Sequence, residues 1–436
     1  MTVDARSGVL PVAPLATAGA ACAPVPTMPL LHLRDLWAPS GRLPYPFGEP
    51  GVSRWYNARA AIWQGLRSLG IRPGDRMIVP AYTCGSELDT LLQAGLRLDF
   101  YRIGAGLDAD LDDLMRLCRT PAAAIFVTHF YGFAQPVAQI AALARRHGMR
   151  LIEDVSHGLY SRTADGQALG SFGEMAVFSL WKSLAVPDGG VLRLRPDATM
   201  LPLPQGERAG AASAAGRLRH MVEETLATQH PATVRAVRRR LTDPLINGLK
   251  RRLAGPPSAA SSQLQSDCSL PPEAAQLAFR RERSMWRMSA LATHLLPRLC
   301  RDDLVDQRRA NYRYMVERLL PGTAVQVLMP ALPALATPLF LPLVAADPRP
   351  FCRHLAAHGI GFFRGWCVFH PQVAWQHFAR EVHLKEHVVV VPVHQGLSNA
   401  DLARIVWVVN HWNLGRDGGD AAAALGRQAA LASPAS

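Results

Sequence analysis

Between Asn57 and Leu194 the chain alternates short apolar runs with amphipathic segments, and this alternation restricts the fold more than any other feature. The pattern predicts helices near 57–70, 87–93 and 137–147, and strands near 77–79, 98–101, 124–127, 150–152, 175–179 and 190–194. Such alternation is typical of an α/β fold, with a parallel sheet covered on both faces. Ligands of these sheets bind at the carboxyl ends of the strands, which draws attention to His129 and to Glu153-Asp154.

The chain changes character between Pro202 and Pro271. This stretch is rich in Ala, Ser, Gly and Pro around a basic segment, 235–253, which we expect to form two short helices because Asp243-Pro244 resembles a cap and first helical residue. A helix is predicted over 302–320. After it, strands near 338–343 and 388–391 and helices near 350–358 and 399–411 predict a second, smaller α/β unit.

We therefore expect four parts along the chain. The predicted parts are an N-terminal arm (1–50), disordered through Pro26; a large domain (51–300) with an atypical basic insertion near 200–270; a small C-terminal domain (301–415); and a flexible tail (416–436).

Composition excludes several classes of protein. Hydrophobic residues make up 49% of the 436 residues, enough for a packed core, and no apolar stretch reaches the length of about 18 residues expected of a spanning helix. The seven cysteines are odd in number and show no C-x-x-C spacing, which favours reduced thiols in a cytoplasmic protein and gives no sign of a metal site. The formal charge of +13 suits an anionic ligand, a nucleic acid or an acidic membrane and does not choose among them.

Lys182 follows an apolar strand, and such a position can make a lysine amine nucleophilic. Taken alone, a lysine near a loop is more often a solvated charge. Asp154, however, stands at the carboxyl end of another predicted strand. An amine that forms a Schiff base and a carboxylate that faces a pyridine nitrogen are the two requirements of pyridoxal phosphate chemistry.

Several short motifs then occur in one order: Arg72-Pro73-Gly74-Asp75, Val79-Pro80-Ala81-Tyr82-Thr83, His129-Phe130-Tyr131-Gly132, Ile152-Glu153-Asp154, Gly170-Ser171-Phe172-Gly173, Phe178-Ser179 with Lys182, and Asp188-Gly189-Gly190. This ordered set resembles the DegT/DnrJ/EryC1/StrS family of sugar aminotransferases. The resemblance is good over 55–194 and continues more weakly over 302–413. It implies the type I fold of pyridoxal phosphate (PLP)-dependent transferases, with a large, mostly parallel-sheet domain and a smaller C-terminal α/β domain.

The resemblance also implies roles for individual residues. Lys182 matches the Schiff-base lysine, Asp154 the partner of the pyridine nitrogen, Ser179 a phosphate-binding hydroxyl, and His157 a residue that packs on the ring face. Ala58-Arg59 stands where the family has Gly-Thr at the start of a helix whose amides face the phosphate. Arg59 is expected to contact the phosphate or to be an ordinary surface arginine, and the sequence does not decide between these.

This chain departs from the family at two of these positions. The spacing between Ser179 and Lys182 is shorter than usual, and Cys84 stands where many relatives stack an aromatic ring on the cofactor. Tyr82 shares a face with Cys84 only if the segment is extended.

Other candidates stay open at this stage. His129 and Tyr131 line the pocket, or His129 bonds only to backbone. Arg308 and Arg309 lie on the helix that opens the small domain, where basic residues usually form a solvated face. Arg364, Trp366 and His394 lie in the small domain, where the family completes its substrate site, and the sequence singles out none of them.

The resemblance implies a PLP-dependent aminotransferase that takes an amino group from a donor such as glutamate to a keto acceptor, most often a nucleotide-linked keto-sugar, and that works as a homodimer. A PLP-dependent dehydratase is the first alternative, and the presence of Lys182 disfavours it because the family's sugar dehydratases carry histidine there. The second alternative is a scaffold that docks on an anionic membrane or nucleic acid through the basic segment. This segment lacks the interleaved aromatic residues that favour nucleic-acid binding. We therefore expect no nucleic-acid partner and no membrane contact.

Overall fold

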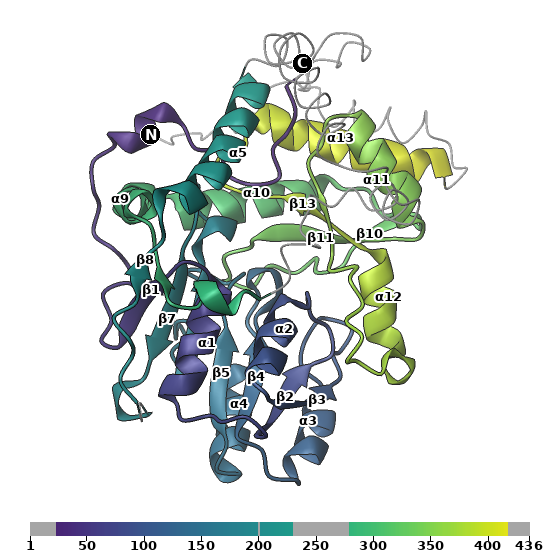
Figure 1. The fold of residues 1–436 in the computed structure, drawn as a ribbon. Coiled ribbons are helices and arrows are strands. Elements are labelled where there is room, and N and C mark those ends of the chain that lie inside the picture. Colours follow the sequence, from purple (N-terminus) through teal and green to yellow (C-terminus); the bar gives the residue numbers. More distant parts are fainter. Residues whose placement is uncertain (1–22, 199–200, 230–278, 417–436) are drawn as a thin grey trace, which may run out of the picture.

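The computed structural model describes residues 23–198, 201–229 and 279–416. These residues build a sheet of nine strands, in the lower half of Figure 1, and a sheet of four strands above it. Among the described residues, no helix is long and apolar enough to cross a membrane.

The large sheet has the strand order β3-β2-β4-β5-β6-β7-β1-β9-β8. Its strands are β1 (Val52–Trp55), β2 (Arg76–Pro80), β3 (Arg97–Tyr101), β4 (Ala124–Thr128), β5 (Arg150–Asp154), β6 (Met175–Ser179), β7 (Gly190–Leu194), β8 (Glu207–Arg208) and β9 (Trp286–Arg287). The strands from β3 to β6 are parallel, whereas β7 runs antiparallel to both β6 and β1. Every strand predicted between 77 and 194 is confirmed.

Helices cover both faces of this sheet, as the alternating pattern predicts. The helices on the two faces are α1 (Ala58–Ser68), α2 (Ser86–Gln93), α3 (Leu111–Cys118) and α4 (Val137–Arg146). The five residues of β4 are all buried, and they divide between the faces: Ala124 and Phe126 pack in the cluster with α1 and α2, and Ile125 and Val127 pack in the cluster with α3 and α4. A strand with apolar residues at successive positions therefore belongs in the middle of the sheet.

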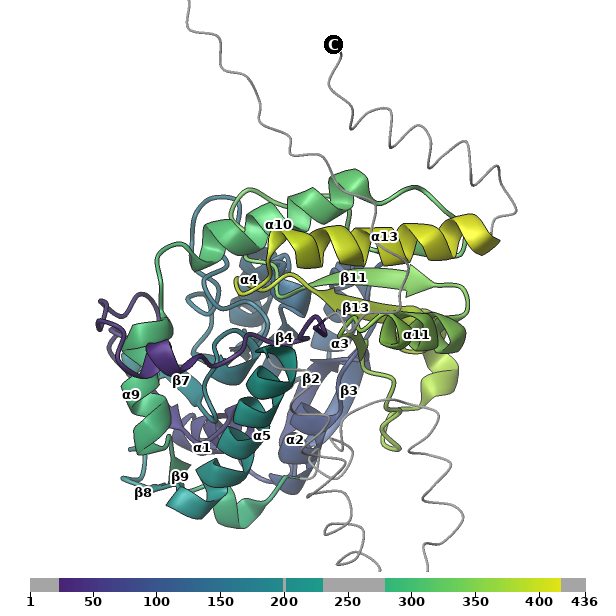
Figure 2. The ribbon, with the colours of Figure 1, turned by 90° about the horizontal axis from the view of Figure 1, so that it is seen from above.

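The small sheet is antiparallel, with the order β10-β11-β13-β12. Its elements are β10 (Val325–Val327), β11 (Phe340–Ala345), β12 (Phe363–Arg364), β13 (Val388–Pro392), α10 (Leu304–Arg318), α11 (Pro348–Ala357), α12 (Ala379–His387) and α13 (Asn399–Arg416). Helices α10 and α13 lie side by side on one face (Figures 1 and 2). The predicted strands and helices of this unit are confirmed, and the pattern missed α12 and the short strands β10 and β12.

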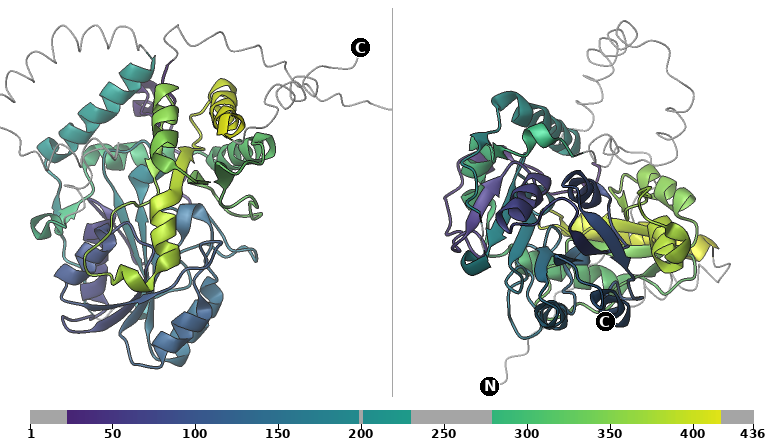
Figure 3. Two further views of the ribbon diagram at one scale, coloured as in Figure 1. Left: turned by 90° about the vertical axis from the view of Figure 1, so that its right-hand side faces the viewer. Right: turned by 60° about the horizontal axis from the view of Figure 1, so that its bottom comes forward.

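Helix α12 reaches down from the small sheet along the side of the large one (Figures 1 and 3). The Glu381 carboxylate accepts a hydrogen bond from the backbone N–H of Ile103, just beyond β3, at 2.6 Å. The two sheets are thus joined by side chains as well as by the connecting chain.

Two helices of the middle region were not predicted, α5 (Ala211–Gln229) and α9 (Ala290–Leu299). Helix α9 packs on β6 and β7 in a third apolar cluster, while the Arg217 guanidinium of α5 lies 4.1 Å from the centre of the Trp181 ring. The basic segment 235–253 and its two predicted helices lie outside the described residues, as does the tail beyond 416.

The N-terminal arm is packed where the structure describes it. Val25 is buried, its N–H donates to the Gly359 carbonyl at 2.8 Å, and its carbonyl accepts from the Gly361 N–H at 2.9 Å. The prediction of disorder through Pro26 is therefore wrong at Val25 and Pro26, because Val25 has an apolar site and backbone partners in the segment between α11 and β12. Residues 1–22 lie outside the described residues.

Candidate active site

The candidate residues gather at one edge of the large sheet. Asp154 ends β5, Ser179 ends β6, and Lys182 follows in a single 3-10 turn, η3 (Leu180–Lys182). Strand β1 runs in the same direction as β6, since both are antiparallel to β7, so helix α1 also begins at this edge. The topology thus brings Asp154, Ser179, Lys182 and the α1 N-terminus together, as the strand pattern predicts.

Lys182 contacts His157 directly. Its Nζ lies 2.9 Å from His157 Nε2, and His157 Nδ1 accepts a hydrogen bond from the backbone N–H of Tyr131 at 3.3 Å. Burial, and next the nearby Lys182 charge, hold the pKa of His157 well below its usual range, so the ring is neutral and we assign its one proton to Nε2. With the proton there, Nε2 can donate to Nζ whenever Lys182 is an uncharged amine, which is the form that attacks a carbonyl.

Two aromatic residues flank His157. The Tyr131 ring stacks on it at 5.7 Å between ring centres, and the Trp366 ring, from the loop after β12, lies at 5.2 Å. Both residues have positive φ, 53° at Tyr131 and 54° at Trp366, which side chains other than glycine's rarely adopt. Strained backbone of this kind gathers at functional sites, and here it brings a side chain of the small unit to the candidate site.

Asp154 is a buried carboxylate, 8% exposed. Its Oδ1 accepts the Ser156 N–H at 2.9 Å. Burial raises the pKa of Asp154, while the charge of Lys182 and the Ser156 hydrogen bond act in the opposite direction. The site therefore holds a buried acid whose charged form a cationic partner would stabilise.

Glu153 and His129, next to these residues, have a structural role. The Glu153 carboxylate accepts hydrogen bonds from the backbone N–H groups of Gly170, Phe172 and Gly173, each at 2.8 Å. His129 is fully buried, accepts from the Gln135 N–H at 3.1 Å and lies 3.3 Å from Glu153 Oε2. Of the two roles left open by the sequence, internal hydrogen bonding holds for His129.

The start of α1 is fixed next to Ser179 by a glycine. Gly190 stands opposite both Ser179 and Trp55 in the sheet register, and a Cβ atom on it would lie 2.1 Å from the carbonyl of Asn57 and 2.5 Å from the Ala58 nitrogen. The Asn57 side chain caps the helix by accepting from the Ala60 N–H at 2.9 Å. The Ser179 hydroxyl forms no hydrogen bond within the described residues, so it is available, with the α1 amides, for an anion.

Arg59 is half-buried on the first turn of α1. Burial lowers its pKa, and the nearby Cys84 and Asp89 act in the opposite direction. Arg59 is thus shielded from solvent in part, and its contact with a phosphate stays a prediction.

The loop that carries Cys84 lies near Lys182. Cys84 Sγ donates to the Glu87 carboxylate at 2.7 Å, and the Cys84 N–H donates to the same group at 3.1 Å. Burial, followed by Glu87, raises the pKa of the Cys84 thiol to about 12, and the Lys182 charge opposes this shift. The thiol stays protonated at neutral pH and is a hydrogen-bond donor to Glu87.

Lys385, on α12, is a buried lysine that sequence reasoning missed. It is 0% exposed, and its Nζ donates to the Thr83 carbonyl at 2.7 Å and lies 5.1 Å from the centre of the Trp375 ring. Burial lowers its pKa to about 8, against the attraction of Cys84, Glu87 and Cys367. A cation of the small unit thus holds the backbone beside Cys84.

Lys385→Met should change how stability depends on pH. The native protein releases the Lys385 proton near pH 8, whereas the unfolded chain holds it to about pH 10.5, so the wild type gains stability as pH rises through this window. One pKa unit corresponds to about 1.4 kcal/mol. Between these pH values we therefore expect the free energy of unfolding of the wild type to rise by about 3 kcal/mol relative to that of the variant. Urea unfolding of both proteins across the window measures the gain, and parallel stability curves would contradict it.

The sequence led us to expect Arg308 and Arg309 on a solvated face, and this expectation is wrong. They are 1% and 6% exposed, because both guanidinium groups donate to backbone carbonyls of other segments of the fold. His394 is also buried, and its Nε2 lies 3.0 Å from the Pro26 carbonyl, so it holds the N-terminal arm. No sequence signal separates these buried charges from exposed ones.

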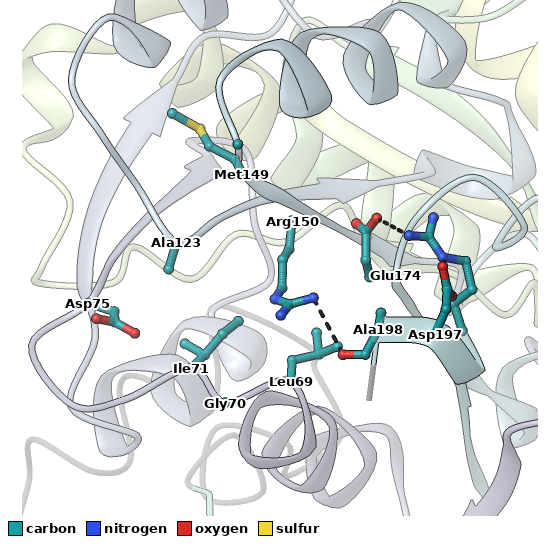
Figure 4. A pocket seen from close by; sticks show the side chains of 12 residues that line it. Leu69, Gly70, Ile71, Asp75, Ala123, Met149, Arg150, Glu174, Asp197 and Ala198 are labelled. Carbon is teal, nitrogen blue, oxygen red and sulfur yellow. Dashed lines mark hydrogen bonds and ion pairs between the residues drawn. The ribbon is translucent and has the colours of Figure 1, made fainter. Parts of the chain in front are cut away.

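A cavity of about 460 Å³ lies away from these residues. Asp75, Ala123 and Met149, which line it, each precede a parallel strand, so it opens at the amino ends of the strands, opposite Lys182 (Figure 4). Its Glu174 pairs with Arg195 at 3.0 Å. This cavity is separate from the candidate active site.

Comparisons with known proteins agree with this arrangement. The model of the DegT/DnrJ/EryC1/StrS aminotransferase family matches residues 54–220. The GDP-perosamine synthase of Vibrio cholerae is 30% identical over 139 residues, which cover 31% of this chain and 38% of that protein. The UDP-N-acetyl-3-dehydro-alpha-D-glucosamine 3-aminotransferase of Acidithiobacillus ferrooxidans is 34% identical over 136 residues, 30% of this chain and 37% of that one.

A solved structure extends the likeness to the whole fold. The sugar aminotransferase CalS13 from Micromonospora echinospora superposes with a TM-score of 0.57 at 17% identity, covering 89% of this chain and 99% of that one. The predicted type I transferase fold is thereby confirmed. The family resemblance is confirmed over residues 54–220, and the sequence match spans less than two-fifths of each of the two curated relatives.

Proposed function

We propose that this protein is a PLP-dependent aminotransferase. The observation that carries the proposal is the 2.9 Å contact between Lys182 Nζ and a buried, neutral His157, at the sheet edge where the buried Asp154 carboxylate also lies. This cofactor needs an amine, an acid and a helix N-terminus that can bind an anion, and all three lie at one edge of the sheet.

The residues present fit pyridoxal phosphate at its ring nitrogen and at its phosphate. Asp154 is a buried acid that favours a cationic partner, which a protonated pyridine nitrogen provides. The Ser179 hydroxyl and the α1 amides suit the phosphate, and the Gly190 contact places them side by side. When bound, the cofactor supplies an electron sink that stabilises negative charge at the carbon being deprotonated.

Lys182 has two tasks in this proposal. Its amine would hold the cofactor, and Nζ would be the base that takes a proton from the α-carbon of the amino donor and the acid that returns it. Asp154 would keep a proton on the ring nitrogen, and His157 would pack against the ring. Trp366 and Tyr131 close the His157 side and exclude water.

For the substrates we propose a small amino donor such as glutamate and a keto acceptor, a nucleotide-linked keto-sugar or a related intermediate. The support is that two relatives carry names of enzymes acting on nucleotide sugars, and that the formal charge of +13 favours an anionic substrate. The presence of Lys182 supports transamination over dehydration. A cytoplasmic location stays a prediction.

An absorption spectrum of the protein purified with cofactor tests the function. We expect a band at about 410–430 nm that borohydride abolishes, with the cofactor's mass left on the tryptic peptide that contains Lys182. A cofactor that stays dialysable after reduction, or that is fixed to another lysine such as Lys385, would contradict the proposal.

We also propose a homodimer in which the second copy completes the phosphate site. On the described residues, Ser179, the α1 amides and Arg59 are the groups near the phosphate position, and a dianion in a closed site is costly without further donors. Sedimentation at micromolar concentration with cofactor bound should show two copies, and a monomer that turns over would overturn the shared site while leaving the cofactor assignment intact.

A further inference from the structure

Arg308 is a buried cation that the proposed mechanism does not use. Its side chain is 1% exposed, and among the described residues it has no carboxylate within salt-bridge distance. Burial lowers its pKa to about 9, and the nearby Tyr160 acts in the opposite direction. Burying an arginine without a counter-charge costs free energy, which indicates that its contacts have a structural or functional role.

All three of its hydrogen bonds go to neutral oxygens of other segments. Nε donates to the Gln395 side-chain oxygen at 2.9 Å, Nη1 to the Pro338 carbonyl at 3.3 Å, and Nη2 to the Ser183 carbonyl at 3.0 Å. Gln395 Nε2 donates to the same Ser183 carbonyl at 3.2 Å. Helix α10 and the loop after β13 thus both donate to one carbonyl of the large unit, while the segment before β11 accepts from the same guanidinium.

That carbonyl belongs to the residue after Lys182. Within the turn, the N–H groups of Ser183 and Leu184 both donate to the Leu180 carbonyl, at 3.0 and 2.8 Å. Those bonds fix the turn from within, and Arg308 with Gln395 fixes it from the small unit. Lys182 itself is half-buried, and its Nζ has only His157 as a hydrogen-bond partner among the described residues.

We propose that Arg308, supported by Gln395, is a positioning residue for Lys182: it anchors the Ser183 carbonyl so that Nζ stays in contact with His157. The inference that this matters for reactivity rests on the proposed function of Lys182. The anchoring itself rests only on the hydrogen bonds and the burial. A charged donor suits this task because hydrogen bonds from an ionised group are stronger than neutral ones.

The chain offers a matched control in the next residue. Arg309 is also buried on α10 and also donates to backbone carbonyls, those of Pro333 and Ala336, far from the Lys182 turn in the chain. Arg308→Met and Arg309→Met therefore remove the same group from the same helix, and only the first removes the anchor of Ser183.

Hydrogen exchange of the cofactor-free proteins tests the anchor without reference to activity. In Arg308→Met we expect the amides of Ser183 and Leu184 to exchange about tenfold faster than in the wild type, because loss of a charged hydrogen bond loosens the turn. Arg309→Met should leave them unchanged and loosen 333–337 instead. Arg308→Lys should recover part of the protection, since one ammonium group can still reach the Ser183 carbonyl.

The capture of pyridoxal phosphate by Lys182, trapped with borohydride and measured by mass, is the second measurement. It should slow about tenfold in Arg308→Met and stay at the wild-type rate in Arg309→Met. Unchanged exchange at 183–184 in Arg308→Met, or an equal effect in Arg309→Met, would overturn the proposal. If Arg308→Met does not fold, Gln395→Met replaces it in both measurements. We expect faster exchange at 183–184 and slower cofactor capture in this variant as well, and unchanged exchange would overturn the proposal. If the amides at 183–184 are protected in the wild type but Lys182 captures no cofactor, the anchor is supported and the proposed function is contradicted.

Discussion

Lys182→Ala is expected to abolish transamination while the protein stays folded. The variant loses the amine that attaches the cofactor and the group that moves the proton, so the rate should fall by about a thousandfold or more. The fold should survive because Lys182 is half-buried and forms one hydrogen bond, to His157. Single-turnover kinetics with an amino donor, together with the thermal midpoint, measure the two effects.

Lys182→Arg is the control for charge. Arginine keeps a cation beside Asp154 and His157, but its guanidinium stays protonated and does not attack a carbonyl at neutral pH. This variant should be as inactive as the alanine variant and should yield no cofactor-modified peptide after borohydride. Turnover at the wild-type rate in either variant would show that another amine does the chemistry.

The central strands of the large sheet could be predicted from the sequence because they are buried on both faces. A run such as Ala124–Thr128 must be apolar at successive positions, and that requirement is visible without a structure. Strands β8 and β9 have two residues each and carry no such pattern. Their pairing depends on the chain returning to β1 from far along the sequence, which local composition does not report.

The candidate site could be predicted where chemistry and topology coincide. Lys182, Asp154 and Ser179 follow strands whose carboxyl ends share an edge, so the strand pattern alone places them together. Arg308 and Lys385 could not be found in this way. A cation on an amphipathic helix is expected in solvent, and only the contact between the two sheets removes these two from water.

The pair Glu153-Asp154 shows the limit of a motif. Successive side chains of a strand point to opposite faces, so two adjacent acids cannot share a task. Glu153 is held by three backbone N–H groups of the 170–173 loop, while Asp154 keeps one such bond, to Ser156. The motif predicts that one acid is functional, and the hydrogen bonds favour Asp154.

Asp154→Asn is expected to keep the cofactor bound and to slow transamination by about a hundredfold or more. The amide keeps the shape of the side chain and can still accept the Ser156 N–H. It carries no negative charge, however, and therefore cannot hold a proton on the ring nitrogen that faces it. The electron sink weakens, and the deprotonation assigned to Lys182 becomes the slow step. A primary isotope effect with donor deuterated at the α-carbon should accordingly increase.

Stability separates this effect from misfolding. The native pKa of Asp154 is raised by burial, so the native protein holds its proton more tightly than the unfolded chain, and the wild type loses stability as pH rises from about 4 through the native pKa. Without cofactor, Asp154→Asn avoids this loss and should melt no lower than the wild type at pH 7. On adding pyridoxal phosphate the order should reverse, because only the carboxylate gains a cationic partner. Asp113→Asn, a buried aspartate on α3 paired with Arg116, should instead lower the midpoint with and without cofactor alike. An equal cofactor-induced rise in the wild type and Asp154→Asn would mean that another group faces the ring nitrogen.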